Sequence, residues 1–117
     1  MTRNARVRGL LFCANWKMQL GPAEVRDFAR RFLAHHQPRE DRDTWFFPAA
    51  VSLQATAEAL GGTPFTRIGV QDIHWEPKGA FTGATSVSLA KAAGAAATLV
   101  GHSERRHVFG ETDEDTS

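Results

Sequence analysis

The hydrophobic positions of the chain fall into short continuous runs separated by longer segments of mixed character. Residues 9–15 form a continuous apolar run, which predicts a strand that is covered on both faces. Three further short runs predict strands at residues 44–48, 65–72 and 97–101. The pattern therefore predicts four strands spread along the whole chain.

The segments between these runs have the spacing of helices. Residues 23–36 carry apolar side chains every three or four positions, which predicts an amphipathic helix with Val25, Phe28, Ala29, Phe32 and Leu33 on its inner face. Residues 49–60 and 87–94 predict two more helices. Ser86 is suited to cap the start of the last one, and Gly94 is suited to end it.

Strands that alternate with helices favour a parallel sheet with covering helices, in a single domain over residues 1–117. The carboxyl ends of parallel strands meet at one edge, where such folds place their ligands. Polar side chains stand at three of these ends, namely Asn15, Lys17, Gln71, His102, Ser103, Glu104 and Arg105. The sequence therefore predicts a site at this edge.

Composition narrows the possible partners. The formal net charge is +1, which predicts no nucleic-acid or membrane partner, and we expect Arg3, Arg6 and Arg8 to form only a solvated terminus. The single cysteine, Cys13, excludes a disulfide within the chain and fits a cytoplasmic protein; its apolar neighbours predict a small core residue. Neither a metal-ligand spacing nor a nucleotide-binding motif is present, so we expect no cofactor and no metal.

The residues at the strand ends suggest chemistry on an anion. Asn15 and Lys17 together suit an oxyanion or a phosphate ester, although a lysine at a strand end more often only reaches solvent. His102 precedes a helical turn that Ser103 can cap, and the free N–H groups of that turn favour a neutral imidazole that donates a hydrogen bond. Glu104 and Arg105, taken alone, favour a structural ion pair.

Three separated motifs carry a resemblance to a known family. They are "NWKM" at residues 15–18, "VQD" with "GAFTGATS" within residues 70–86, and "VGHSERR" with "FGET" within residues 100–112. In this order and spacing they resemble the triosephosphate isomerases, which interconvert dihydroxyacetone phosphate and glyceraldehyde 3-phosphate. The resemblance implies an α/β fold that is half of a TIM (β/α)8 barrel, with about four of the eight strand–helix units.

The resemblance also implies roles for the residues at the strand ends. Asn15 and Lys17 match substrate-binding residues, and Lys17 supplies the positive charge. His102 matches the catalytic group that polarises the substrate carbonyl. Ser103 and Glu104 match residues that line the active site. We expect Lys17, His102 and Glu104 to carry any catalysis, and Asn15, Lys17 and Ser103 to bind a small phosphorylated triose.

Other matched positions concern support and subunit contact. Gln71 matches a residue that supports the site from beneath. Thr82 matches the tip of a loop that inserts into a neighbouring subunit, and Arg105 matches an arginine at that contact. Ala84 stands where the family usually has the glutamate that pairs with this arginine, which predicts a weaker interface, and Asp72 stands where asparagine is common.

The family's catalytic glutamate, closing lid and phosphate-binding loops match no part of these 117 residues. Since a general base contributes roughly 10²–10⁴ in rate, we expect very low or no isomerase activity from this chain alone. Two alternatives remain open. One is a non-catalytic self-assembling module, and the other is a truncated enzyme that needs a separate second half.

A half-barrel has two open sheet edges and an uncovered inner face, which we expect to include Leu11, Cys13, Val70 and Val100. A few hundred Å² of exposed apolar surface, at ~25 cal/mol per Å², corresponds to several kcal/mol. We therefore expect a homodimer that completes the barrel, or a dimer of such dimers.

Overall fold

The strands and helices alternate along the chain as the sequence pattern predicts. A computed structural model describes residues 9–117, so the basic residues Arg3, Arg6 and Arg8 lie outside the described part of the chain. The elements are β1 (Leu10–Asn15), α1 (Pro22–His35), β2 (Arg42–Phe47), a 3-10 turn η2 (Ala50–Ser52), α2 (Leu53–Leu60), β3 (Thr66–Val70), α3 (Val87–Ala92), β4 (Ala97–Thr98), α4 (Ser103–His107) and α5 (Asp113–Thr116).

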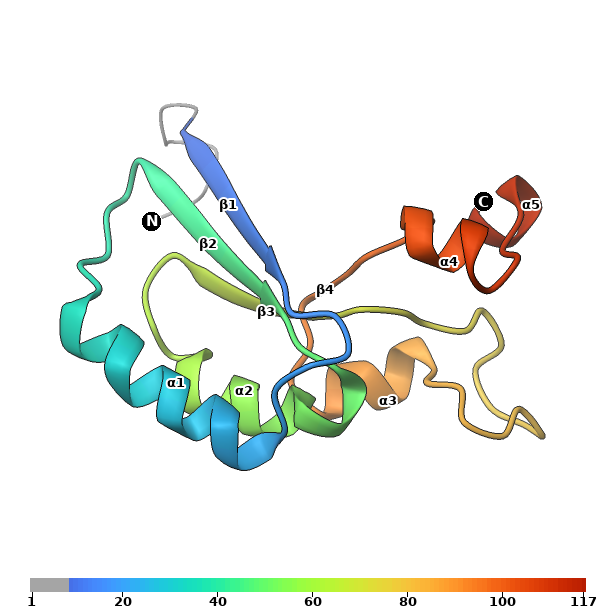
Figure 1. Ribbon diagram of the computed structural model, residues 1–117, viewed down its shortest axis with the longest axis horizontal. Helices are drawn as coiled ribbons and strands as arrows, with labels where there is room; N and C mark the ends of the chain where they lie inside the picture. Colours follow the sequence, from blue (N-terminus) through green and yellow to red (C-terminus); the bar gives the residue numbers. More distant parts are fainter. Residues whose placement is uncertain (1–8) are drawn as a thin grey trace.

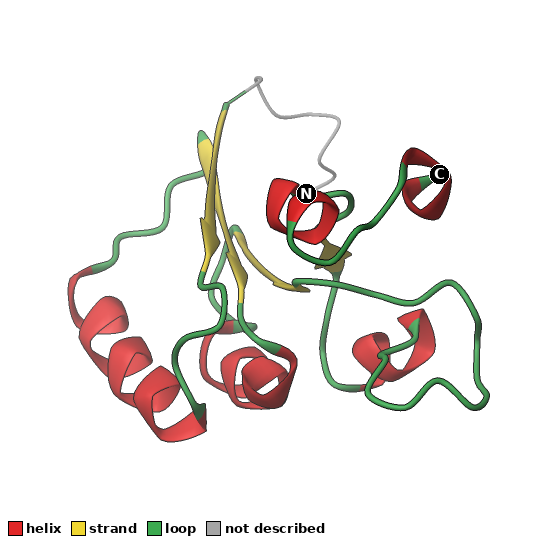
Figure 2. Cartoon of the chain, turned by 45° about the vertical axis from the view of Figure 1, so that its right-hand side comes forward, coloured by secondary structure: helices red, strands yellow, loops and turns green. Residues whose placement is uncertain are grey.

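The four strands form one sheet in the order β1-β2-β3-β4, and all neighbouring pairs are parallel. Figure 1 shows α1, α2 and α3 along one side of this sheet. In Figure 2, α4 and α5 lie apart from those three helices. The arrangement confirms an α/β fold with a parallel sheet, and its connections bring every strand's carboxyl end to the same edge.

Local signals explain where the helices begin and end. The Gly21 amide donates to the Glu24 side chain at 3.1 Å, and Pro22 occupies the first turn, where no amide hydrogen is needed. Ser86 caps α3 by accepting a hydrogen bond from the Leu89 amide at 3.1 Å, as predicted. Gly94 follows α3 with φ 107°, a backbone conformation that favours glycine, which also confirms the prediction.

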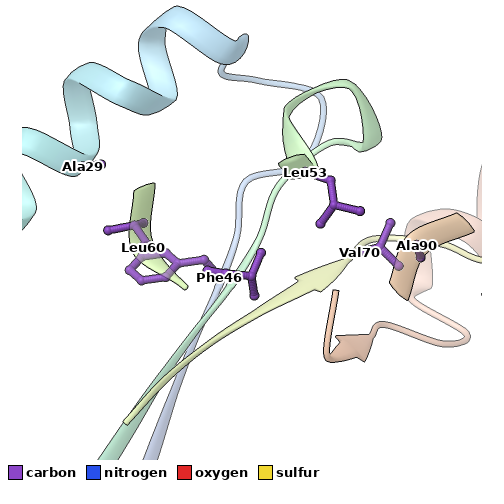
Figure 3. Packing of buried hydrophobic residues seen from close by; sticks show 7 residues of the cluster. Ala29, Phe46, Leu53, Leu60, Val70 and Ala90 are labelled. Atoms are coloured by element: carbon purple, nitrogen blue, oxygen red, sulfur yellow. The ribbon is translucent and has the colours of Figure 1, made fainter. Parts of the chain in front are cut away.

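The core lies between the sheet and these helices. Buried side chains from α1, α2, α3, β2 and β3 pack together, and Figure 3 shows seven of them at close range. The cluster consists of Ala29, Phe46, Leu53, Leu60, Ile68, Val70 and Ala90. Trp16 and Phe28 extend it through ring contacts with Phe46, at centroid distances of 5.4 and 5.8 Å.

The other face of the sheet is exposed at Leu11, Cys13 and Val100, as expected of a half-barrel, but it departs from other sequence predictions. β1 is not covered on both faces, since Leu11 is 51% exposed, and Cys13 is exposed rather than part of the core. Val70 was expected on the open inner face, but it is buried beneath the helices beside Ala90. Val100, in contrast, is 59% exposed. β1 is exposed on both faces over most of its length, with Leu10 62% and Phe12 49% exposed. Val70 is buried because alternate residues of β3 point to opposite faces.

Two aromatic side chains partly fill the inner face. A Cβ atom on Gly69 would lie 2.4 Å from the Phe47 ring, so only glycine permits this close approach. The Trp45 ring lies 6.5 Å from the Phe47 ring, and the Arg67 guanidinium lies 5.8 Å from the Trp45 centroid. The inner face is therefore covered at β2 and β3 but open at the β1 edge.

The core predicts a clear contrast between two leucines that both lie in helices. Replacing the fully buried Leu60 by alanine should lower the free energy of unfolding by about 2–5 kcal/mol, because it opens a cavity. The matched change Leu89→Ala, at a position that is 63% exposed, should cost less than about 0.5 kcal/mol. Urea unfolding followed by circular dichroism measures both, and equal losses would contradict the packing described here.

Candidate active site

The polar residues at the strand ends come together as the parallel topology predicts. Asn15 is the last residue of β1, and Gln71 follows β3 directly. Lys17 Nζ lies 2.7 Å from Glu104 Oε1, although β1 and β4 are at opposite edges of the sheet. Three strand spacings of ~4.8 Å would separate these edges by ~14 Å in a flat sheet. The ion pair therefore closes across the carboxyl end of the sheet.

Lys17 is held in an unusual backbone conformation. Its φ is 54°, in the left-handed region that few side chains other than glycine adopt. The Lys17 amide donates to Asn15 Oδ1 at 3.0 Å. Gln71 Nε2 donates to the Lys17 carbonyl at 2.7 Å and to the Phe47 carbonyl at 2.9 Å. These bonds fix the direction of the lysine side chain, and they place Gln71 where a residue supporting Lys17 is expected.

His102, rather than Ser103, caps α4. His102 Nδ1 accepts a hydrogen bond from the Glu104 amide at 3.1 Å, while Ser103 is the exposed first residue of the helix. Sequence reasoning assigned the cap to serine because serine is the commoner capping residue. Nδ1 is occupied as an acceptor by this contact, which leaves Nε2 on the opposite side of the ring as the nitrogen that can donate. The imidazole is thereby oriented as a hydrogen-bond donor.

Glu104 lies close to both Lys17 and His102. One oxygen of its carboxylate contacts Lys17, and the other lies 3.8 Å from His102 Nδ1. The hydrogen bond from Lys17 holds the pKa of Glu104 below its usual value. Glu104 therefore stays ionised and balances the charge of Lys17, and it is poorly suited to accept a proton from carbon.

Arg105 points to the other side of α4. Its Nη2 lies 3.3 Å from Asp72 Oδ2, and its Nε donates to Glu111 Oε2 at 3.3 Å. The guanidinium also lies 4.5 Å from the centre of the Phe109 ring. Burial raises the pKa of Asp72, and the nearby Glu111 acts in the same direction, while Arg105 opposes both.

Several of these features were not predicted from the sequence. Sequence reasoning missed that Asp72 and Glu111 are the partners of Arg105, although Asp72 stands at a strand end like the other site residues. Thr82 lies in the long exposed loop between β3 and α3, and its predicted role at a subunit contact stays a prediction. In residues 9–117, no three His, Cys, Asp or Glu side chains gather as a metal site. None of the helices in that range is long and apolar enough to cross a membrane.

A parallel α/β sheet with polar side chains gathered at the carboxyl ends of its strands is the arrangement found in the class of (β/α) barrel folds. The triosephosphate isomerase family model matches residues 10–117. The chain belongs to the triosephosphate isomerase family, and the resemblance in its three motifs is confirmed.

Individual relatives agree with this assignment. Triosephosphate isomerase of Bdellovibrio bacteriovorus is 41% identical over 88% of this chain and 42% of the relative. That of Aquifex aeolicus is 39% identical over 89% of this chain and 42% of the relative. L-erythrulose-1-phosphate isomerase of Mycolicibacterium smegmatis is 42% identical over 87% of this chain and 40% of the relative. The chain thus spans about two fifths of the length of these curated relatives, which is consistent with half of a TIM barrel.

The ion pair across the site predicts a change in the titration of Glu104. Replacing Lys17 by methionine should raise the pKa of Glu104 toward its ordinary value, because the main cause of the lowered pKa is removed. In the wild type, the pair stabilises the fold above the unfolded-state pKa of the glutamate, and this stabilisation is lost as pH falls through the lower folded-state pKa. Carboxyl 13C NMR measures the titration directly. Lys91→Met on α3 is the control, and a pKa of Glu104 that moves equally in both variants would contradict the assignment.

Proposed function

We propose that this chain supplies the carbonyl-polarising side of an isomerase site for small phosphorylated aldoses and ketoses. The observation that carries the proposal is the position of Glu104, which pairs with Lys17 through its carboxylate and donates its amide hydrogen to His102. This position brings an ammonium group and an imidazole to the same carboxyl end of the sheet. Both groups favour negative charge on a substrate oxygen.

The chemistry of such a site follows from these two groups. In a ketose–aldose interconversion, a base removes a proton from the carbon beside the carbonyl, and the electron pair moves onto the carbonyl oxygen. The resulting enediolate is stabilised by the Nε2 hydrogen of His102 and by the charge of Lys17. The hydroxyl proton then moves to the former carbonyl oxygen, and returning the abstracted proton to the former carbonyl carbon completes the isomerisation. Asn15 and Ser103 are the proposed additional substrate-binding groups.

The proton-transfer step is the weak point of these 117 residues acting alone. In the described part of the chain, the carboxylate beside Lys17 and His102 is Glu104, whose ionised form the lysine stabilises. Any catalysis by the polypeptide alone is therefore proposed to be very slow, with full activity requiring a base from elsewhere. The cytoplasm is the proposed location, because an unpaired cysteine suits a reducing compartment.

The names of the relatives suggest the range of substrates. Two of them are triosephosphate isomerases and a third is an L-erythrulose-1-phosphate isomerase, so the shared chemistry is a ketose with a terminal phosphate. We propose dihydroxyacetone phosphate as the first substrate to test, because the triose name recurs among these relatives.

A coupled assay for conversion of dihydroxyacetone phosphate tests the proposal. His102→Ala should lower any measured rate by about 10²-fold or more, because the proton donor to the carbonyl oxygen is lost. Glu104→Gln should change the rate as well, since it releases Lys17 from its ion pair. The control is Glu58→Gln, at an exposed position of α2, which should leave the rate unchanged. Identical rates in the wild type, His102→Ala and Glu104→Gln would reveal contamination and remove the proposal.

Self-association is a second candidate function, and the uncovered β1 edge favours it. Leu10, Leu11 and Phe12 are each about half exposed or more, and within residues 9–117 β1 pairs with a strand on only one side. We propose that a second copy of the chain covers this edge and the adjoining inner face. Two such dimers are then proposed to associate into a dimer of dimers. A separately encoded second half of the barrel is the alternative occupant.

Analytical ultracentrifugation at micromolar concentration tests the self-association. The wild type should sediment with at least twice the mass of one chain, and Leu11→Lys should shift it toward the monomer, because a charge would enter the apolar contact. Leu89→Lys, at a position on α3 that is 63% exposed against 51% for Leu11, is the control and should not change the mass. A stable wild-type monomer would remove this candidate.

A further inference from the structure

The helix that carries the candidate site has little apolar anchorage. α4 has no buried residue, although its first turn holds the His102 cap and the Glu104 carboxylate. Two ion pairs connect it to the ends of distant strands. Glu104 pairs with Lys17 beyond β1, and Arg105 pairs with Asp72 beyond β3. The direction of α4 therefore depends on charge pairs on two sides of His102.

The guanidinium of Arg105 is held by further contacts besides its ion pair with Asp72. The Arg105 side chain is 35% exposed and stacks on Phe109, and its Nε is already occupied by Glu111, which is 16% exposed. Three contacts thus fix the plane of the guanidinium. Of these partners, only Asp72 lies outside the segment that carries α4, just beyond the end of β3, since Phe109 and Glu111 follow α4 on the same segment.

We propose that Asp72 is a positioning residue of the candidate active site: by holding Arg105 it sets α4 against the end of β3 and so orients the imidazole of His102. The proposal rests on the assignment of the site made above. It deepens that assignment, because it names a residue that acts on the carbonyl-polarising group without touching the substrate.

The surroundings of the Asp72 carboxylate support a role for this residue other than stabilising the fold. Burial and Glu111 together outweigh the attraction of Arg105, so the environment of Asp72 disfavours its charged form. An uncharged isostere should therefore leave the whole fold equally stable or more stable. The same change should loosen α4, because it weakens the interaction of Arg105 with residue 72 at the end of β3. A residue that serves only stability would move both quantities in the same direction.

Hydrogen exchange in Asp72→Asn separates these two effects. The amide of Glu104, which donates to His102 Nδ1, should exchange about two- to fivefold faster, the range expected for loss of one partly exposed ion pair. The global stability from urea unfolding should stay the same or rise. Asp27→Asn is the matched control, because Asp27 is also paired with arginine but lies on α1, and it should leave the Glu104 amide unchanged.

A second variant tests whether Asp72 acts through Arg105. In an Arg105→Gln background, adding Asp72→Asn should no longer change the exchange of the Glu104 amide, because the partner is already absent. The same acceleration in both backgrounds would overturn the proposal, as would an unchanged amide in Asp72→Asn alone. Loss of protection throughout β2 in Asp72→Asn would assign Asp72 a purely structural role and also overturn it. These readouts do not depend on turnover, so they can fail or succeed separately from the proposed isomerase chemistry.

Discussion

Because β1, β2, β3 and β4 pair in parallel and in chain order, their carboxyl ends lie at one edge of the sheet. That constraint brings residues that are far apart in the sequence into one site. Lys17 and Glu104, which are separated by most of the chain, meet at 2.7 Å. The core on the helix side, built around Phe46 and Leu60, holds the sheet in place without using any group of the site. The residues that form this core are therefore different from the residues of the candidate site.

Most of the helices and strands were predictable, because the spacing of apolar residues differs between a helix and a strand. The amphipathic pattern from Val25 to Leu33 and the cap at Ser86 both depend only on neighbouring residues. Two predictions were wrong, namely that β1 is covered on both faces and that Val70 lies on the open inner face. Both depend on which elements pack on each face, and a run of apolar residues does not specify that. β4 is also shorter than the predicted strand, with only Ala97 and Thr98 in the ladder.

The gathering of polar residues at the strand ends was predictable, but the bonds among them were not. The sequence placed His102 at a strand end beside a helical turn, yet Ser103 was the expected cap, since capping is decided by the backbone angle at the turn. The left-handed backbone of Lys17 had no signal, because it is held by Gln71, a residue from a distant strand. The link from Asp72 to Arg105 likewise depends on the packing of α4 and was not anticipated.

Residues that follow β1 and β4 meet across the carboxyl end of the sheet, where Lys17 pairs with Glu104. Nuclear Overhauser contacts between the side chains of Lys17 and Glu104 in solution test this central claim most directly. The account predicts a strong contact between the lysine ε-protons and the glutamate γ-protons, together with contacts between Trp16 and Phe46 that report an intact core. An intact Trp16–Phe46 contact without any Lys17–Glu104 contact would contradict the claim.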